Sequence, residues 1–339
     1  MTHFTKALTA GALCLGLTGA AGAAENIKMA TIAPGTSAYL TMSTMATIVN
    51  AGQDKYEITV DATGAATKHV VNMAEGQLDF VMTSPTVHFL LQNQKAMYQK
   101  LSKAPELSKR IALAFWFPYG AYHVVSYADA DIMKLDDLRG KKVFLGPPGG
   151  GAWNAAAQWV EAQTGMKPGV DYDNFKGSWS SAFQAFQDRQ VDVYINGGIA
   201  PFPQIEQLAA TSKLRLVGPS KAEIDAQTDA QLAPTRAKGR SLDMIPAGIY
   251  GPNVVNEGDV YSIGATVGVV TRKNMDEGAV YDIVKTFWEG AEKMRPNAPW
   301  LRHVTLDYAV REGGIPLHPG AARYYREIGL EIPAGSLPD

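Results

Sequence analysis

A run of glycines between an apolar segment and an alanine-rich segment is the part of the sequence best suited to binding chemistry. Val143 to Leu145 are apolar and are typical of a short buried strand, Gly146 to Gly151 form a loop almost without polar side chains, and a helix is predicted from Trp153 onward. The first N–H groups of a helix have no partner within the helix, and its dipole places positive charge there. The loop therefore favours an anion, such as a carboxylate or a phosphate.

This glycine loop does not match the motifs that bind nucleotides. Its outer glycines have the spacing of a P-loop, but Ala152 and Trp153 stand where Lys and Ser or Thr are needed. The G-x-G formed by Gly149 and Gly151 is followed by Asn154 at the third glycine position of a dinucleotide motif. A flexible strand-to-helix connection without any ligand is the alternative interpretation of the loop.

Several other predicted strands end in small or hydroxyl residues, in the same way as the strand before the glycine loop. In open parallel sheets, ligands bind beyond the carboxyl ends of the strands, so we expect these ends to line one cleft. The predicted strands cover residues 26–32, 56–62, 78–82 and 191–195, and the turns after them cover 33–37, 63–67, 83–85 and 196–201.

The predicted binding residues come from these turns and from four aromatic side chains near them. The aromatic residues could form walls of the cleft, and packing into the core is the alternative for each of them. The full set is Gly35, Thr36, Ser37, Tyr39, Thr63, Gly64, Ala65, Thr83, Ser84, Tyr122, Gly149, Gly150, Gly151, Trp153, Trp179 and Asn196.

Length and composition predict an α/β protein with two domains. The 339 residues are 46% hydrophobic and 19% charged, which is enough apolar material for two cores. Strands alternate with helices of ordinary length, and this order is typical of α/β architecture. A net charge of −2 without a basic run argues against a nucleic-acid partner.

The middle and end of the chain supply the crossings between the two domains. Two strands, 111–117 and 122–127, are predicted around Pro118, Tyr119 and Gly120, where the chain first crosses. Residues 219–256 have little periodicity, a return strand is predicted over 261–271, and an amphipathic helix is predicted over 279–294.

The first residues have the pattern of a secretory signal peptide. Lys6 precedes a short apolar segment, and Ala21-Gly22-Ala23 matches an A-x-A cleavage site, so we expect export to the periplasm and cleavage after Ala23. Cys14, the one cysteine of the sequence, lies in the segment that would be removed. The mature chain is then expected to form no disulfide.

Four motifs together identify a family. They are Thr63-Gly64 followed by Gly76-Gln77-Leu78-Asp79, the run from Asp137 to Val143, the glycines at 149–151, and the run from Ile315 to Glu327 that contains Pro316, His318 and Pro319. With these motifs, which span most of the mature chain, the sequence resembles the TAXI family, the extracytoplasmic solute receptors of tripartite ATP-independent periplasmic (TRAP) transporters. His318 is expected to hold a turn before a terminal helix.

The resemblance implies a two-lobed, type II-like periplasmic binding protein fold with a hinge between the lobes. Together with the predicted crossings, it divides the chain into a signal peptide (1–23), lobe 1 (24–120 plus 260–339) and lobe 2 (121–259). The implied ligand is a small carboxylate such as glutamate, glutamine or 2-oxoglutarate, and the implied partners are the membrane subunits of a TRAP transporter. A monomer is expected, with no cofactor, no bound metal and no catalytic residue.

The chain departs from the TAXI pattern at three of its turns. The first, residues 31–36, has less glycine than is usual in the family. The chain also has Gly149-Gly150-Gly151 where the family usually has Gly-Ser-Gly, and Thr63-Gly64-Ala65-Ala66 where Thr-Gly-Gly-Ser is common. These other two turns keep their backbone donors and have fewer hydroxyl donors.

Two other functions are alternatives to a TRAP receptor. A binding protein for an ABC importer or a sensor kinase would have the same fold and the same exported location. A secreted hydrolytic enzyme is the alternative from another class, but the sequence has no H-E-x-x-H, no G-x-S-x-G and no cysteine beyond Cys14. We therefore expect a protein that is not an enzyme.

Overall fold

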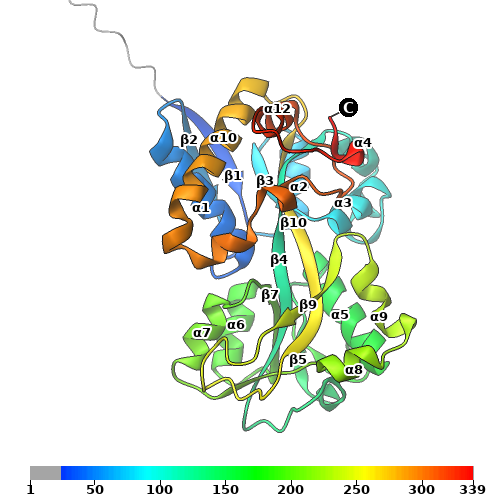
Figure 1. The fold of residues 1–339 in the computed structure, drawn as a ribbon. Helices are drawn as coiled ribbons and strands as arrows, with labels where there is room; N and C mark the ends of the chain where they lie inside the picture. Colours follow the sequence, from blue (N-terminus) through cyan, green and yellow to red (C-terminus); the bar gives the residue numbers. More distant parts are fainter. Residues whose placement is uncertain (1–23, 339) are drawn as a thin grey trace, which may run out of the picture.

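A single mixed β-sheet runs through both lobes of the molecule (Figure 1). The computed structural model describes residues 24–338, so the predicted signal peptide and Cys14 lie outside the described residues. Within that range the strand order is β2-β1-β3-β10-β4-β7-β5-β6, with β8 paired to β4 and β9 paired to β10. Strands and helices alternate along most of the chain, which confirms the predicted α/β class. No helix of the described part is long and apolar enough to cross a membrane.

The first lobe is built from the two ends of the described chain. Strands β1, β2 and β3 pair in parallel, and the helices that cover them begin at the turns that follow the strands. Thr36 and Ser84 cap two of these helices by accepting the N–H of Tyr39 and Val87. The elements are β1 (Glu25–Ala30), α1 (Ser37–Gly52), β2 (Tyr56–Asp61), α2 (Ala66–Ala74), β3 (Phe80–Thr83), α3 (Pro85–Gln92), α4 (Ala104–Ser108), α10 (Glu277–Met294), α11 (Leu306–Ala309) and α12 (Pro319–Glu327).

The second lobe lies between the two crossings. Its short strands β5, β6 and β7 are parallel, and β8 and β9 add to the sheet on the long crossing strands. The elements are β5 (Lys142–Phe144), α5 (Gly151–Thr164), β6 (Asp173–Asn174), α6 (Trp179–Gln187), β7 (Val193–Gly198), α7 (Pro203–Ala209), β8 (Leu214–Leu216), α8 (Lys221–Asp225), α9 (Asp229–Arg236) and β9 (Arg240–Ile245).

Two long antiparallel strands, β4 (Ile111–Tyr127) and β10 (Val260–Arg272), connect the lobes (Figure 1). The prediction of two strands in place of β4 was wrong. Pro118 and Gly120 do not end the strand, because β10 shifts its register between Ala265 and Thr266, opposite them. Gly120 has φ +97°, and a Cβ there would lie 2.1 Å from the Gly198 carbonyl oxygen, so the crossing requires glycine.

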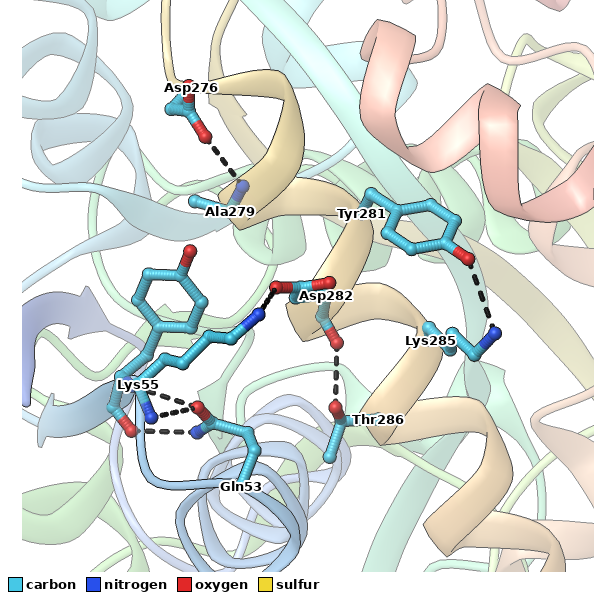
Figure 2. A network of polar contacts seen from close by, with 9 residues as sticks. Gln53, Lys55, Asp276, Ala279, Tyr281, Asp282, Lys285 and Thr286 are labelled. Carbon is cyan, nitrogen blue, oxygen red and sulfur yellow. Dashed lines mark hydrogen bonds and ion pairs between the residues drawn. The ribbon is translucent and has the colours of Figure 1, made fainter.

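Helix α10, from the last part of the chain, packs against α1, from its first part. A Cβ on Gly290 would lie 2.2 Å from Ile48 Cγ2, which shows how closely α10 approaches α1. At the edge of this contact, Lys55 Nζ lies 2.8 Å from an oxygen of Asp282 on α10 (Figure 2). Gln53 holds the turn before β2 by accepting the N–H groups of Lys55 and Tyr56. Residues from opposite ends of the sequence thus complete one lobe.

The segment after β10 holds the predicted turn at His318. His318 Nδ1 accepts the N–H of Gly320 at 3.2 Å, and Nε2 donates to the carbonyl oxygen of Met275 at 3.1 Å. The His318 side chain is buried and caps α12. The prediction that this residue holds a turn is confirmed.

The second lobe contains a buried histidine whose two ring nitrogens are both hydrogen-bonded. His123 is fully buried, its Nδ1–H donates to the Ala121 carbonyl at 2.9 Å, and its Nε2 accepts from the Tyr250 hydroxyl at 2.6 Å. The Tyr250 hydroxyl also accepts the N–H of Phe202. If Nε2 took up a proton, it could no longer accept the Tyr250 hydroxyl hydrogen, and His123 would carry a positive charge in the core. Burial lowers the pKa of His123 to about 4.

We expect the protein to lose stability as the pH falls from about 6.5, the pKa of an unfolded histidine, toward 4. As the pH falls, the unfolded state binds the proton before the folded state does. The stabilisation from neutral His123 is therefore fully present only above about pH 6.5. The loss from His123 is about 2 kcal/mol between pH 7.5 and 5, and His88, whose pKa burial also lowers to about 4, adds a similar loss. Urea unfolding at the two pH values measures this difference. In His123→Gln the difference should shrink by about 2 kcal/mol, and an unchanged difference would show that His123 does not titrate in this way.

Candidate functional site

A cavity of about 720 Å³, a volume that includes its open mouth, lies between the lobes. The carboxyl ends of β1, β2, β3 and β5 reach it, as do the first residues of α2, α3, α5 and α6 and the middle of the crossing strands. The lining residues are Ile32, Gly64, Ala65, Ala66, Thr67, Met82, Thr83, Ser84, Thr86, Val87, Tyr119, Tyr122, Pro147, Gly150, Gly151, Ala152, Trp179, Gly239, Arg240, Ala265, Thr266 and Val267.

Two helices begin at this cavity without a side-chain cap. The N-cap residues Ala65 of α2 and Gly150 of α5 have no side-chain hydrogen bond to the helix. The first N–H groups of both helices therefore have no partner from a capping side chain, and the helix dipole makes this region of the wall electropositive. α2 belongs to lobe 1 and α5 to lobe 2, so an anion in the cavity could accept from both lobes.

Arg240, the first residue of β9, brings the only charged side chain to the described wall of the cavity. Its Nη1 is buried without a hydrogen-bond partner, and its Nη2 lies 3.4 Å from the carbonyl oxygen of Gly151. Burial lowers the pKa of the guanidinium, which the neighbouring Tyr122 partly offsets. A guanidinium stays protonated in proteins, so the cavity holds a cation that no described carboxylate neutralises.

Most hydroxyl groups of the wall already have partners. Ser84 Oγ accepts the N–H of Val87, Thr86 Oγ1 donates to the Lys238 carbonyl at 3.3 Å, and Thr266 Oγ1 pairs with the Tyr308 hydroxyl. Thr67, Thr83 and Tyr122 are the exceptions: no hydrogen bond within the described part of the chain involves their hydroxyls, and Thr83 Oγ1 is buried without a partner. Buried polar groups are almost always hydrogen-bonded, so Thr83 Oγ1 and Arg240 Nη1, on residues that line the cavity, are candidates for contact with a ligand after a small movement of the wall.

Half of the predicted binding residues lie on the wall of the cavity. The turns after β2, β3 and β5 reach it because the carboxyl ends of these strands point to the same space. The residues concerned are Gly64, Ala65, Thr83, Ser84, Tyr122, Gly150, Gly151 and Trp179. Both Tyr122 and Trp179 are also largely buried, so they serve the core and the wall together.

The predicted turn after β1 lies beside the cavity and contacts the other lobe. The hydroxyl of Ser37 accepts the N–H of Ile199 at 3.0 Å, and a Cβ on Gly35 would touch the side chain of Gln204. Thr36 is buried as the cap of α1. None of these residues, nor Tyr39, is among those that line the cavity.

The remaining predicted residues also lie off the wall. Thr63 donates to Asp61, and Trp153 Nε1 lies 3.4 Å from Asn174 Oδ1. Gly149 lies in the loop before α5, at φ +74° with open space around it. Asn196 is fully buried, where it accepts from the Tyr119 hydroxyl and donates to the Tyr194 hydroxyl and to Gln204.

Sequence reasoning missed the wall residues that come from β9 and from the middle of the crossing strands. Gly239 and Arg240 lie within the segment of little periodicity, 219–256, so no pattern placed them near the glycine loop. Tyr119 and residues 265–267 lie within strands, where the sequence signal concerned only burial. The prolonged apolar run through Pro118 could have indicated one crossing strand, with its central residues facing the space between the lobes.

The lobes touch each other around the cavity. Besides the contacts of Ser37 and Thr86, a Cβ on Gly239 would lie 2.6 Å from the ring of Pro85, and a Cβ on Gly151 would lie 3.1 Å from Val87 Cγ2. Small residues on each lobe thus allow the other lobe to approach. The structure has the lobes together, and the cavity is bounded on both sides.

One solved structure of a periplasmic protein shares this fold, and two others align with lower scores. A structure described as a periplasmic transporter aligns with a TM-score of 0.51 and 15% identity over 90% of this chain and 93% of that chain. The alkanesulfonate-binding protein SsuA from Xanthomonas axonopodis pv. citri, bound to MOPS, aligns with a TM-score of 0.48 and 16% identity over 90% and 85%. DctP7, a Bordetella pertussis extracytoplasmic solute receptor binding pyroglutamic acid, aligns with a TM-score of 0.45 and 12% identity over 90% and 92%.

The similarity to the structure described as a periplasmic transporter is a similarity of fold, and it agrees with the predicted periplasmic binding protein architecture. A family relationship is shown by the sequence itself. The model of the NMT1-like family matches residues 29–329, which is most of the 339 residues. The chain therefore belongs to the NMT1-like family.

Proposed function

We propose that this protein is an extracytoplasmic solute receptor that binds a small organic anion between its lobes. The observation that carries the proposal is the unpaired Arg240 guanidinium in the wall of the cavity between the lobes. An isolated buried charge is costly unless it is paired, and a bound anion would pair it. The uncapped starts of α2 and α5 add donors for the same group.

The lobes would close on the ligand in a hinge motion. Lobe 1 would comprise residues 24–120 plus 260–339 and lobe 2 residues 121–259, with β4 and β10 forming the hinge. A ligand that contacts both lobes favours the closed state because it makes those contacts only there. Arg240 on lobe 2 and Thr83 on lobe 1 would make the contacts with the ligand that exist only in the closed state.

The resemblance to TAXI receptors supports delivery of the ligand to a TRAP transporter from the periplasm, with the receptor acting as a monomer. It also supports glutamate, glutamine or 2-oxoglutarate as candidates. An ABC importer remains the alternative partner, since an organic-anion receptor of this fold would suit either membrane system. Identification of the membrane protein encoded next to this chain, or purified with it after crosslinking in intact cells, separates the two.

A melting assay tests the proposed function. Mature protein is unfolded in guanidinium and refolded, which removes any bound ligand, and is then mixed with glutamate, glutamine, 2-oxoglutarate, C4-dicarboxylates or simple monocarboxylates. A ligand at 100 times its Kd stabilises the native state by about 2.7 kcal/mol, which raises the Tm by about 5 °C for a chain of this size. We expect at least one organic anion to do so and uncharged amides to have no effect. An absence of any shift with every anion would contradict the proposal.

A further inference from the structure

The charges around the cavity restrict the ligand more than the fold does. Arg240 is the one charged residue among those that line the described wall, and no Asp or Glu is among them. Two basic residues near the turn after β2 do not add to it. Lys68 is exposed and off the wall, and burial lowers the pKa of His69, which leaves that ring neutral at pH 7.

A second charge on the ligand would therefore meet no oppositely charged side chain of its own. An ammonium group, as in an amino acid, would leave water without meeting a carboxylate. A second carboxylate would compete with the first for the guanidinium and for the N–H groups that begin α2 and α5. Each transfer of an unpaired charge into a low-dielectric site is strongly unfavourable. The wall accommodates one negative charge.

The remaining part of the ligand would meet few free polar groups besides the hydroxyls of Thr67, Thr83 and Tyr122. The hydroxyls of Ser84, Thr86, Thr266 and Tyr119 are hydrogen-bonded within the protein. A ligand with more hydroxyl groups than the wall can serve, such as a sugar acid, would lose part of its hydration without gaining equivalent partners.

Apolar side chains form most of the rest of the wall. Ile32, Met82 and Val87 contribute from lobe 1, and Ala152 and the Trp179 ring contribute from lobe 2. Such surfaces favour an alkyl or aromatic group on the ligand, because binding removes the apolar surface of that group from water.

We infer, on the basis of the proposed function, that the ligand is a monoanion with an apolar tail. Its head, a carboxylate or a sulfonate, pairs with Arg240, and its tail lies against the apolar wall. The class excludes the amino acids and dicarboxylates that the family resemblance suggests.

Matched ligands test this inference by calorimetry on refolded protein. 3-Phenylpropanoate is compared with L-phenylalanine, which adds an ammonium, with phenylsuccinate, which adds a carboxylate, and with 3-phenylpropanamide, which has no charge. 4-Methylpentanoate and L-leucine repeat the comparison with a smaller tail, and 2-phenylethanesulfonate tests the other head group. We expect at least one monoanion to bind about 100-fold more tightly than its charged and uncharged counterparts.

The possible results distinguish a failure of the monoanion inference from a failure of the proposed function. Equal or tighter binding of the amino acid, of phenylsuccinate or of glutamate, lost in Arg240→Met, would overturn the monoanion inference and leave the proposed function intact. Equal binding of the amide and the acid, unchanged in Arg240→Met, would overturn both. Absence of binding by all the monoanions would also overturn the inference. Preference for the carboxylate or the sulfonate identifies the head group within the supported class.

Discussion

Arg240→Met is expected to lower the affinity for the organic anion by about 100-fold or more, and to leave the ligand-free protein at least as stable as the wild type. The affinity falls because the anion would enter the cavity without a counter-charge. Stability is kept because methionine removes a buried cation whose Nη1 has no partner and replaces it with an apolar chain of similar length. Calorimetry and thermal unfolding of the refolded protein measure the two effects.

Arg236→Met is the matched control for this substitution. Arg236 ends α9, four positions before Arg240, and its guanidinium forms an exposed ion pair with Asp229 at 2.8 Å. Exposed pairs contribute little to stability, so the control should bind the anion as the wild type does. If Arg240→Met keeps the wild-type affinity, or if it unfolds the ligand-free protein, Arg240 has a structural role and not a binding role.

Gly151→Leu is expected to lower the affinity by about 10- to 100-fold by preventing the lobes from closing on the ligand. A Cβ at this position would lie 3.1 Å from Val87 Cγ2 and 3.9 Å from Ser84 Oγ, both on the other lobe. A longer side chain must enter the cavity or separate the lobes. The fold itself should tolerate the change because Gly151 begins α5 and has no positive φ.

Two variants control for the size and chemistry of this change. Gly151→Ala adds only the Cβ, and we expect a small loss of affinity from it. Gly258→Leu adds the same side chain at a glycine with open space around it, and we expect no loss. If Gly151→Leu binds the anion with wild-type affinity, the loop before α5 does not take part in the closure of the lobes.

Part of the candidate site could be predicted because strand ends are set by local sequence. Gly64, Ser84 and Gly151 each follow or end a strand-to-helix turn, and parallel strands bring such turns to one edge of a sheet. The glycine loop also showed its chemistry directly, since a helix start without a capping side chain favours an anion in any fold.

The same pattern could not distinguish a wall residue from a contact between lobes. Ser37 resembles Ser84 in sequence, with a small residue at the start of a helix after a strand. In the structure the Ser37 hydroxyl accepts the N–H of Ile199, whereas Ser84 lies on the wall. The difference depends on how the second lobe approaches the first, and that geometry is not encoded near either residue.

Arg240 could not be predicted for a related reason. Nothing in the sequence distinguishes it from Arg236, which is exposed and paired. Its position depends on the pairing of β9 with β10, in which Arg240 lies opposite Ala265, and on the packing of α9 against α5. Neither contact has a local signal, because β9 is partly exposed and its residues do not alternate regularly.

A crystal structure of the refolded protein with its tightest-binding acid would show directly whether Arg240 holds the ligand. We expect one anionic group between the lobes, within hydrogen-bond distance of the Arg240 guanidinium, with the rest of the molecule against the apolar wall near Met82 and Trp179. An acid bound elsewhere, or bound in the cavity with its anionic group away from Arg240, would contradict a binding role for this residue.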